Sequence, residues 1–294
     1  MTGLGIDIGG TSVKLAAVRD GAVVWTARSA PYERPTAPQL QLALRGAATG
    51  RPDPDTPAVG LCVPGLLDAD RLTVKHSVNV PGLDGLRLDD FVGSALGRRP
   101  ASLTVVTDAN ASGTDVYVSR RLSGRLFLLA IGAGVGAAVI DDGTPLCVDG
   151  DSPGHFGQMD VSVEGEDVIG PDGGAGSLEG YLSAAALARR YGETAWVEKL
   201  RPDDVPMRAL TKAVRIAHAL YRPHHVCLAG GIGNRLTHLL PDLRRGIEDR
   251  LTSIARAGWT FTTGDSDFHA AQGAARAALR PLPPLPRTQG RGQG

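Results

Sequence analysis

The chain of 294 residues is predicted to fold as an α/β protein with two lobes. An apolar strand pair around a glycine-rich turn opens the chain, a second such pair lies near residue 132, and several apolar runs between them end at polar residues. Because single domains commonly hold roughly 100–150 residues, the length favours two lobes. We place them at residues 1–118 and 119–280, with a disordered tail at 281–294 that is rich in proline, glycine and arginine.

The first element is a β-hairpin over residues 4–18 with the turn Gly9-Gly10-Thr11. Such a turn exposes backbone N–H groups where a phosphate can approach without meeting a Cβ. Asp7 lies inside the first strand between two isoleucines, and an ionised carboxylate there must be compensated. A metal ion or phosphate-bound water would compensate it, and a hydrogen-bonded structural carboxylate is the alternative. The hairpin predicts phosphate binding.

The rest of the first lobe is predicted to be a mixed sheet with a crossover helix. Its expected elements are a strand at 22–27, a helix at 39–47, and strands at 58–65 and 103–108. The last two runs do not alternate, which is typical of strands buried on both faces. Asp108 ends the second of them, at the sheet edge where a general base would lie. An N-cap of the following helix explains this aspartate equally well.

The second lobe is predicted to repeat the strand-pair arrangement and to add helices. Its expected elements are strands at 126–131 and 136–140, an irregular loop at 150–176, helices at 178–191 and 205–220, a strand at 226–229, an amphipathic helix to residue 250, and a helix at 270–279 that packs back on the first lobe. The turn Gly230-Gly231 follows the strand at 226–229. By itself it is no more than a tight turn.

The composition of the chain indicates which class of ligand or partner it binds. The 31 basic and 31 acidic residues balance and no basic tract occurs, so a small molecule is expected rather than nucleic acid or a membrane. No signal peptide and no apolar stretch of about 20 residues is present, which favours the cytoplasm. Cys62, Cys147 and Cys227 are odd in number and lie in apolar runs, so all three are expected to be buried and reduced.

Two glycine patterns match motifs whose structural context is missing. Residues 132–137 fit the dinucleotide fingerprint G-x-G-x-x-A, but a strand follows where that motif needs a helix, so we interpret them as a second glycine hairpin. Residues 150–154 fit the hydrolase elbow G-x-S-x-G, but a proline and a loop follow the serine. We therefore expect neither a nicotinamide cofactor nor a serine nucleophile.

Taken in order, these segments resemble the ROK family (repressors, open reading frames, sugar kinases) of the actin/hexokinase-like ATPase superfamily. The resemblance extends from residue 4 to about residue 280. The matching segments are 7–11, 63–65, 79–82, 107–111, 132–136, 154–159, 176–179 and 229–232. It implies a two-lobed actin-like ATPase (ribonuclease H-like) fold with a central cleft, and a homodimer.

The resemblance also implies a kinase that uses ATP and Mg²⁺ and whose ATP phosphates lie between the two glycine hairpins. Asp108 matches the catalytic base that takes a proton from the acceptor hydroxyl. Asp7 would hold Mg²⁺ through water. The implied cofactor-binding residues are Asp7, Gly9, Gly10, Thr11, Lys14, Gly132, Ala133, Gly134, Gly230 and Gly231, and the substrate-binding residues are Asn79, Asp108, His155, Gln158 and Glu179.

The chain departs from the family at the acceptor pocket. Where the family usually has Gly-Glu-x-Gly-His-Met, residues 154–159 are Gly-His-Phe-Gly-Gln-Met, and Thr107 replaces the usual Asn before Asp108. The family's zinc module pairs that histidine with three cysteines, whose positions here hold Gly170, Asp172 and Ser177. We expect no zinc. His155 in place of a carboxylate should penalise plain glucose.

These departures favour a cyclitol acceptor of the valiolone type, and the alternative is a hexose or amino-sugar kinase. The chain could instead be a non-catalytic sugar sensor or an inactive kinase, and these are the other hypotheses for its function. ROK repressors carry an added N-terminal helix-turn-helix, whereas this chain begins on the hairpin, so we expect no DNA-binding role. Because Asp7, Asp108 and both hairpins are intact, we favour an active enzyme.

Overall fold

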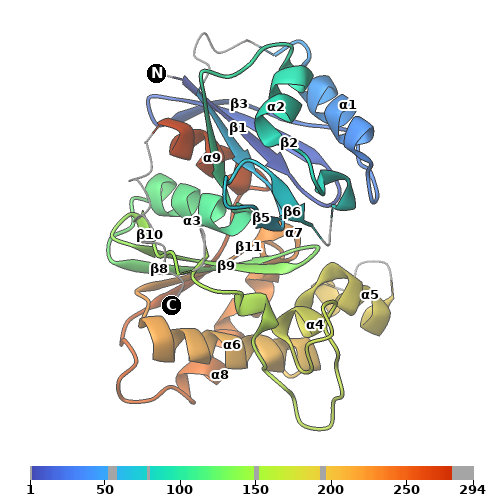
Figure 1. Cartoon of the computed structure of the whole chain (residues 1–294). Helices are drawn as coiled ribbons and strands as arrows, with labels where there is room; N and C mark the ends of the chain where they lie inside the picture. The colour runs from blue at the N-terminus through green and yellow to red at the C-terminus, as the bar shows by residue number, and fades with distance from the viewer. Residues whose placement is uncertain (1, 52–57, 78–79, 149–151, 193–196, 280–294) are drawn as a thin grey trace, which may run out of the picture.

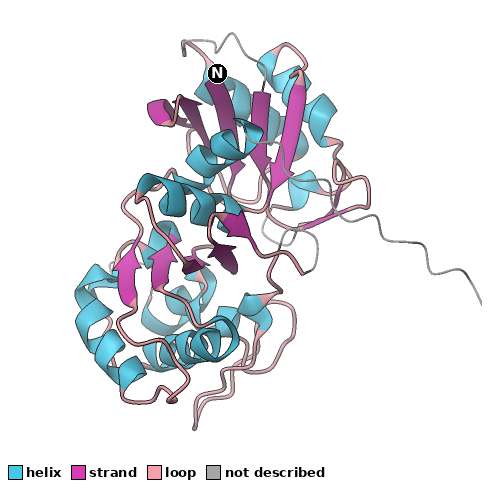
Figure 2. Ribbon diagram, turned by 90° about the vertical axis from the view of Figure 1, so that its left-hand side faces the viewer, coloured by secondary structure: helices cyan, strands magenta, loops and turns pink. Residues whose placement is uncertain are grey.

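A computed structural model describes residues 2–51, 58–77, 80–148, 152–192 and 197–279. They form two α/β lobes, one at each end of an elongated molecule (Figure 1). The side view in Figure 2 separates the two sheets and the helices that cover them. The two-lobed α/β class expected from the sequence is therefore confirmed. Asn79 and the tail at 281–294 lie outside the described residues.

The N-terminal lobe contains a five-stranded sheet in the order β3-β2-β1-β4-β7. Strands β1, β2 and β3 form an antiparallel meander, and β4 and β7 run parallel to β1. Helices α1 and α2 pack together beside this sheet, as Figure 1 shows. The elements are β1 (Thr2–Ile8), β2 (Val13–Arg19), β3 (Ala22–Arg28), α1 (Ala37–Ala48), β4 (Ala58–Cys62), β5 (Leu66–Leu67), β6 (Val74–His76), η1 (Pro81–Leu83), α2 (Leu88–Leu96) and β7 (Ser102–Val106).

The C-terminal lobe repeats this plan with the sheet β10-β9-β8-β11-β12. Here β8 and β9 form the hairpin, and β11 and β12 run parallel to β8. The described elements that follow β7 in the chain are α3 (Asp108–Ser119), β8 (Arg125–Ile131), β9 (Val135–Asp141), β10 (Thr144–Pro145), η2 (Phe156–Gln158), α4 (Leu178–Leu182), α5 (Ala184–Tyr191), η3 (Val197–Lys199), α6 (Val205–Tyr221), β11 (His225–Ala229), α7 (Gly230–Gly233), η4 (Leu236–Leu239), α8 (Leu240–Glu248), β12 (Thr260–Thr263) and α9 (His269–Leu279).

Helices cover both faces of the C-terminal sheet because its central strands are apolar on both sides. Leu126 and Leu128 of β8 pack toward α3, whereas the alternate residues Phe127 and Leu129 belong to the core shared with α4, α6 and α8. This burial on both faces agrees with the non-alternating sequence of the strand.

Helix α9 is the last element of the chain, and it packs into the N-terminal lobe and against α3. The approach is so close that glycine is required on both sides. A Cβ at Gly60 of β4 would lie 1.9 Å from the Ala274 carbonyl oxygen, and one at Gly273 would lie 1.8 Å from the Ala111 carbonyl oxygen of α3. Backbone contact therefore fixes α9 between the first sheet and α3.

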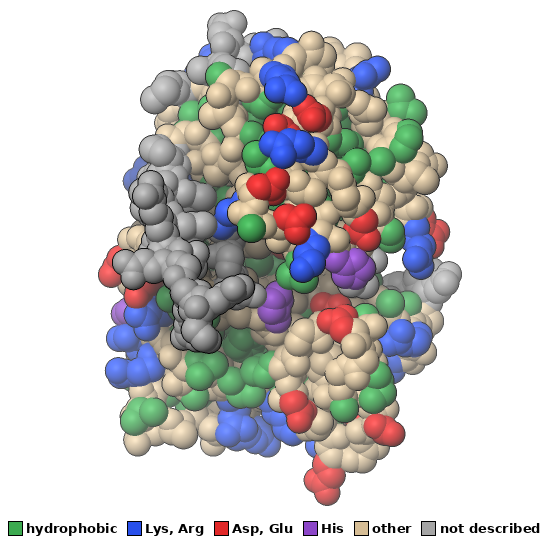
Figure 3. All heavy atoms as spheres, viewed as in Figure 1, with side chains coloured by type: hydrophobic (Ala, Val, Ile, Leu, Met, Phe, Trp, Pro, Cys, Tyr) green, Lys and Arg blue, Asp and Glu red, His purple; other side chains and the backbone are tan. Residues whose placement is uncertain are grey.

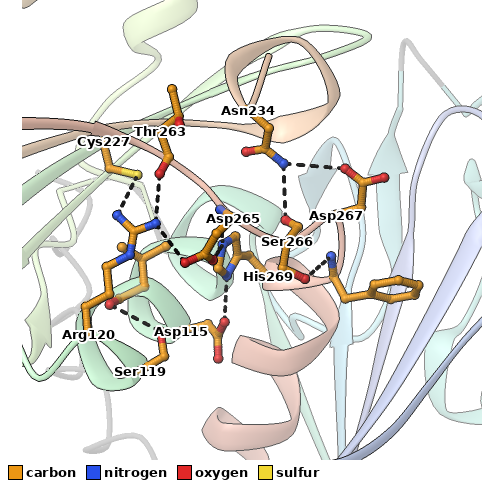
Figure 4. Close-up of polar contacts among 12 residues, drawn as sticks. Asp115, Ser119, Arg120, Cys227, Asn234, Thr263, Asp265, Ser266, Asp267 and His269 are labelled. Atoms are coloured by element: carbon orange, nitrogen blue, oxygen red, sulfur yellow. Dashed lines mark hydrogen bonds and ion pairs between the residues drawn. The ribbon is translucent and has the colours of Figure 1, made fainter. Parts of the chain in front are cut away.

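A buried polar network ties α3 to α9 and to the segment before α9 (Figure 4). Asp115 of α3 accepts a hydrogen bond from Arg276 Nε at 2.7 Å and lies 2.7 Å from His269 Nδ1. Arg120, in the turn after α3, donates to the Thr263 carbonyl oxygen at 2.8 Å and pairs with Asp265 at 3.3 Å. Because Asp115 is almost fully buried, its partners Arg276 and His269 are needed to compensate its charge.

Several expectations need correction. The helix expected at 178–191 is broken at Ser183, whose hydroxyl caps α5 by accepting the Ala186 N–H. The expected helix to residue 250 is divided into α7, η4 and α8, and strand β12 was not predicted. Cys62 and Cys227 are buried as expected, but Cys147 is exposed because it follows the short edge strand β10.

The described part of the chain contains no helix that is both long and apolar enough to cross a membrane.

We predict that Gly60→Ala lowers the free energy of unfolding by about 2–4 kcal/mol, because the new methyl group overlaps the backbone of α9. Urea denaturation measures this change. Gly46→Ala is the matched control: Gly46 lies in α1 with open space around its Cβ position, so this change should raise stability by up to about 1 kcal/mol. Equal effects of the two substitutions would contradict the close packing.

Candidate active site

The first glycine hairpin is the turn between β1 and β2. The Gly9 N–H donates to the Ser12 carbonyl oxygen at 3.1 Å, which closes the turn. Tyr32 supports it from outside: its hydroxyl donates to the Gly9 carbonyl oxygen at 2.7 Å, and its own N–H donates to the Thr11 carbonyl oxygen at 2.9 Å. Gly9 and Gly10 are half-buried and Thr11 is exposed. The tip can therefore be reached by a ligand.

The second glycine hairpin is the turn between β8 and β9, where Gly132 N–H donates to the Gly134 carbonyl oxygen at 2.9 Å. Ala133 at its tip is exposed. Glu179, in the first turn of α4, accepts the Val135 N–H through Oε2 at 2.8 Å. Burial raises the pKa of Glu179, and the bond from Val135 opposes that rise. The α4 carboxylate thus holds the hairpin in place.

Asp108 is the first residue of α3, and Thr107 is the N-cap that accepts the Asn110 N–H at 3.3 Å. Asp108 is therefore not the N-cap of α3, which was the alternative explanation from the sequence, because Thr107 has that role. Asp108 Oδ1 accepts its neighbour's N–H, from Ala109, at 2.8 Å. A Cβ at Gly136 of β9 would lie 3.8 Å from the same oxygen. The second hairpin and Asp108 are consequently close together.

The electrostatics of Asp7 and Asp108 are coupled. The pKa of Asp7 is raised to about 6, chiefly by burial; the charge of Asp108 contributes to this rise, and Lys14 and Arg28 oppose it. The Asp108 side chain is accessible to solvent at the surface, but protein atoms on its inner side remove hydration and raise its pKa, against the opposing effect of the Ala109 N–H and Lys14. Two carboxylates with raised pKa values are typical of a functional site.

Asp7, Lys14 and Arg28 form a row across the first sheet. Asp7 pairs with Lys14 in the register of β1 and β2, and Lys14 pairs with Arg28 in that of β2 and β3. Lys14 Nζ lies 3.8 Å from Asp7 Oδ2. The row places two cations beside the first hairpin, where they can neutralise a bound phosphate chain.

The Gly230-Gly231 turn begins α7 at the end of β11. Gly230 has φ +85°, and a Cβ there would lie 2.5 Å from the Ile131 carbonyl oxygen at the end of β8. The turn therefore lies against the strand that leads into the second hairpin. Gly231 is exposed and has open space at its Cβ position, which suits the flat face of a nucleoside.

Residues 154–159 lie beside the second hairpin. A Cβ at Gly157 would lie 2.2 Å from the Val135 carbonyl oxygen and 3.4 Å from Glu179 Oε2. His155, just before η2, is exposed, and Gln158 at its end is half-buried. Figure 3 shows histidine and acidic side chains together on the surface at the level where the two lobes meet. The structure thus brings Gln158, Glu179 and the hairpin into one region.

Asp7 fits a divalent cation held through water. Its carboxylate is buried, its pKa is raised by lost hydration, and its ion-pair partner Lys14 lies at 3.8 Å. A divalent cation would stabilise the ionised form. Within the described residues, no group of three His, Cys, Asp or Glu side chains could hold a metal by itself. The oxygen-rich environment of bound phosphates would have to complete the coordination.

The positions of the zinc module are close in space but carry other chemistry. A Cβ at Gly170 would lie 2.1 Å from Ser177 Oγ. Ser177 caps α4 by accepting the Gly180 N–H at 3.2 Å. Two other contacts hold this loop. The Val163 N–H donates to the Tyr181 hydroxyl, and Glu166 forms an ion pair with Arg190. The expected absence of zinc stays a prediction.

The sequence reasoning missed an ion pair between the lobes near this site. Arg28 of β3 donates to Asp267 Oδ2 at 2.8 Å. Asn234, which follows α7, donates to Asp267 Oδ1 at 3.4 Å (Figure 4). Arg28 also lies over the Phe268 ring at 5.3 Å. The meander pattern could have placed Arg28 in the row with Lys14, but its partner is 239 residues away. No local signal in the sequence identifies such a contact.

Comparisons with known proteins identify one family. The profile of the ROK family matches residues 3–280. An N-acetyl-D-glucosamine kinase from Erwinia tasmaniensis is 28% identical over 228 residues, which cover 68% of this chain and 73% of that protein. An N-acetyl-D-glucosamine kinase from Yersinia pseudotuberculosis is 25% identical over 284 residues, which cover 86% and 90%.

A solved structure has the same fold. The crystal structure of a ROK family glucokinase from Streptomyces griseus, in complex with glucose and AMPPNP, superposes with a TM-score of 0.72 at 21% identity, covering 95% of this chain and 99% of that one. At this identity the similarity establishes the fold alone.

We predict that Asp7→Asn stabilises the protein at neutral pH. The pKa of Asp7 rises from 3.8 to about 6 on folding, so its favourable contribution is present below pH 3.8 and is lost as pH rises through 6. Removing the charge should raise the free energy of unfolding by on the order of 2–3 kcal/mol at about pH 7.5 and by much less at about pH 4.

Denaturation curves at the two pH values measure this difference. Asp249→Asn, at an exposed position after α8, is the matched control and should change stability at neither pH. A destabilised Asp7→Asn protein at neutral pH would contradict the uncompensated burial of Asp7.

Proposed function

Because the chain belongs to the ROK family, we propose that it is a kinase that transfers the γ-phosphoryl group of ATP to a hydroxyl group of a sugar or sugar-like ring. The observation that carries the proposal is the position of Asp108 at the start of α3, beside the second hairpin and electrostatically coupled to Asp7 of the first. Relatives named as N-acetyl-D-glucosamine kinases support the reaction class.

The residues of this site can each perform a step that phosphoryl transfer requires. N–H groups of the two glycine turns would bind the phosphates of ATP, and Lys14 with Arg28 would neutralise their charge. Mg²⁺, when bound, supplies further neutralisation of the phosphate oxygens, and Asp7 is the residue that would hold it through water. Alignment and charge neutralisation supply most of the catalysis in this reaction class.

Asp108 would act as the general base. Its ionised carboxylate accepts the proton of the acceptor hydroxyl as the hydroxyl oxygen attacks the γ-phosphorus, and ADP leaves. Because lost hydration raises the pKa of Asp108, the ionised group is a stronger base than an ordinary aspartate. The Ala109 N–H fixes one of its oxygens.

The acceptor would lie against His155, Gln158 and Glu179, with Asn79 outside the described residues. Glu179 already gives one oxygen to Val135, so it can hold a hydroxyl with the other. His155 offers one donor or acceptor where a carboxylate would accept from two hydroxyls. This favours a ring other than plain glucose, and a valiolone-type cyclitol is our first candidate.

An amino sugar is the second candidate, because the relatives that match most of the chain are named as N-acetyl-D-glucosamine kinases. We also propose that the enzyme is cytoplasmic and homodimeric, that it needs no zinc, and that its partners are small molecules. A sugar sensor without catalysis remains the competing function, and the next two experiments separate it from a kinase.

We predict that Asp108→Asn lowers kcat by about 100-fold or more, because the amide cannot accept the hydroxyl proton, while KM for the acceptor changes little. Steady-state kinetics measure both constants. Asp249→Asn should leave both unchanged. An Asp108→Asn enzyme with the normal kcat would contradict the assignment of the base, and a wild-type protein that binds sugar without turnover would be a sensor.

We predict that the purified protein phosphorylates a valiolone-type cyclitol or an N-acetylated hexosamine with a kcat/KM at least about tenfold above that for glucose. The panel contains glucose, N-acetylglucosamine, N-acetylmannosamine and the cyclitol, assayed by ADP release with ATP and Mg²⁺. Preference for the hexosamines over the cyclitol would select the second candidate. A clear preference for glucose would contradict the specificity argument.

A further inference from the structure

A cavity of about 500 Å³ lies in the C-terminal lobe between α6, residues 160–162 and residues 250–255. Helix α3, which carries Asp108, covers one face of the C-terminal sheet, and α6 belongs to the core on the opposite face (Figure 1). The sheet therefore separates the cavity from Asp108, whereas α4, which carries Glu179, lies on the same side of the sheet as α6. The volume of the cavity is within the range of small-molecule sites.

Three cations line this cavity: Lys212 and Arg215 of α6, and Arg250 after α8. In the part of the chain that the structure describes, none of them forms an ion pair with a carboxylate, whereas Arg244 of the neighbouring α8 pairs with Glu248 at 2.9 Å. Unpaired cations that converge on one cavity create a positive potential there and favour an anionic ligand.

Among the described residues that line the cavity, the only acidic one is Asp160, and one of its carboxylate oxygens already accepts hydrogen bonds. Its Oδ1 accepts the Ser162 N–H at 2.8 Å and the Ser162 hydroxyl at 2.6 Å. These bonds, and to a smaller extent the charge of Lys212, lower the pKa of Asp160, so the lining carries one negative charge and three positive charges. The lining keeps a net positive charge.

Backbone carbonyl groups hold the cations in place without using all their donors. Arg215 Nε donates to the Arg250 carbonyl oxygen at 3.0 Å, and Arg250 Nη1 donates to the Gly246 carbonyl oxygen at 3.0 Å. Lys212 donates to the Ser162 carbonyl oxygen. A guanidinium has five N–H donors, so both arginines keep donors for a ligand.

His218 gives an independent indication of a ligand. It lines the cavity from α6 and is almost fully buried, with its ring edge-on to that of Trp259 at 4.6 Å, and neither ring nitrogen has a hydrogen-bond partner among the described residues. Burial lowers the pKa of His218 to about 4, so the ring is neutral and offers one donor and one acceptor. That pair of functions suits a hydroxyl group. Ile216 and Leu251 supply apolar surface for a carbon skeleton.

We propose that this cavity binds a small organic phosphate monoester, with its phosphate on Lys212, Arg215 and Arg250 and its hydroxylated body toward His218. A phosphate dianion matches three cations better than a single carboxylate does. Sugar phosphates and nucleoside monophosphates share this chemistry. The proposal does not depend on the kinase activity.

Isothermal titration calorimetry tests the proposal. The full chain is first saturated with AMPPNP, so that the phosphate positions at the glycine hairpins are filled, and then titrated with glucose 6-phosphate, AMP or inorganic phosphate. We expect saturable binding of at least one monoester at one site per chain. Inorganic phosphate, which lacks the hydroxylated body, should bind more weakly.

Arg215→Gln and Arg250→Gln should each weaken monoester binding by about tenfold or more, because each loses a charged hydrogen bond. Arg245→Gln is the control: Arg245 lies on α8, pairs with Asp242 and does not line the cavity, so its loss should not change the affinity. The affinity for AMPPNP, measured first, should be the same in all variants.

Thermal melting followed by circular dichroism shows whether each variant is folded. Among the described residues, the Arg250 side chain donates a hydrogen bond only to a carbonyl group of the preceding helix α8, so Arg250→Gln tests the proposal if Arg215→Gln fails to fold. The absence of saturable binding in the wild-type protein, or unchanged affinity in the variants, would overturn the proposal. So would equal affinity for inorganic phosphate and both monoesters.

Discussion

The backbone contact of α9 with the first sheet and with α3 is the constraint on which the candidate site depends. Glycines at 60 and 273 allow α9 to approach both neighbours more closely than any side chain would permit. The C-terminal segment thereby joins the strand that carries Asp7 to the helix that carries Asp108. The Asp115, His269 and Arg276 network adds directional hydrogen bonds to this packing, so continuous contacts link the strand that carries Asp7 to the helix that carries Asp108.

The candidate active site places a charged side chain, Asp7, in a buried position where an apolar side chain would be more stable. Asp7 is buried beside a single lysine, and its raised pKa reports that its charge is only partly compensated. Lys14 acts on both Asp7 and Asp108, so one ammonium group adjusts two carboxylates on different elements. Such under-compensated charge lowers stability in the free protein, and a ligand that carries both cation and phosphates would complete it.

Local patterns were sufficient for much of the fold. Both hairpins, the non-alternating strands and α6 follow from residue type and periodicity, because strands buried on both faces and glycine turns have strong local signals. The features that the sequence did not predict depend on tertiary contacts. The break at Ser183 depends on a cap that competes with a continuous helix, and Cys147 is exposed by the edge position of β10. Asp108 could be located from sequence, but its partners in space could not, since Lys14 and Gly136 come from distant strands.

The Arg28, Asp267 and Asn234 contact has a mechanical consequence. Both members of its ion pair are substantially exposed, at 42% and 50%, and pairs of this kind contribute roughly 0–1 kcal/mol. It joins the edge strand β3 of the first sheet to Asn234 at the end of α7, through the segment that leads into α9. Breaking this ion pair therefore costs little free energy. Because salt screens exposed charges, raising the salt concentration weakens this pair, and the packing of α9 is left to hold the two lobes together.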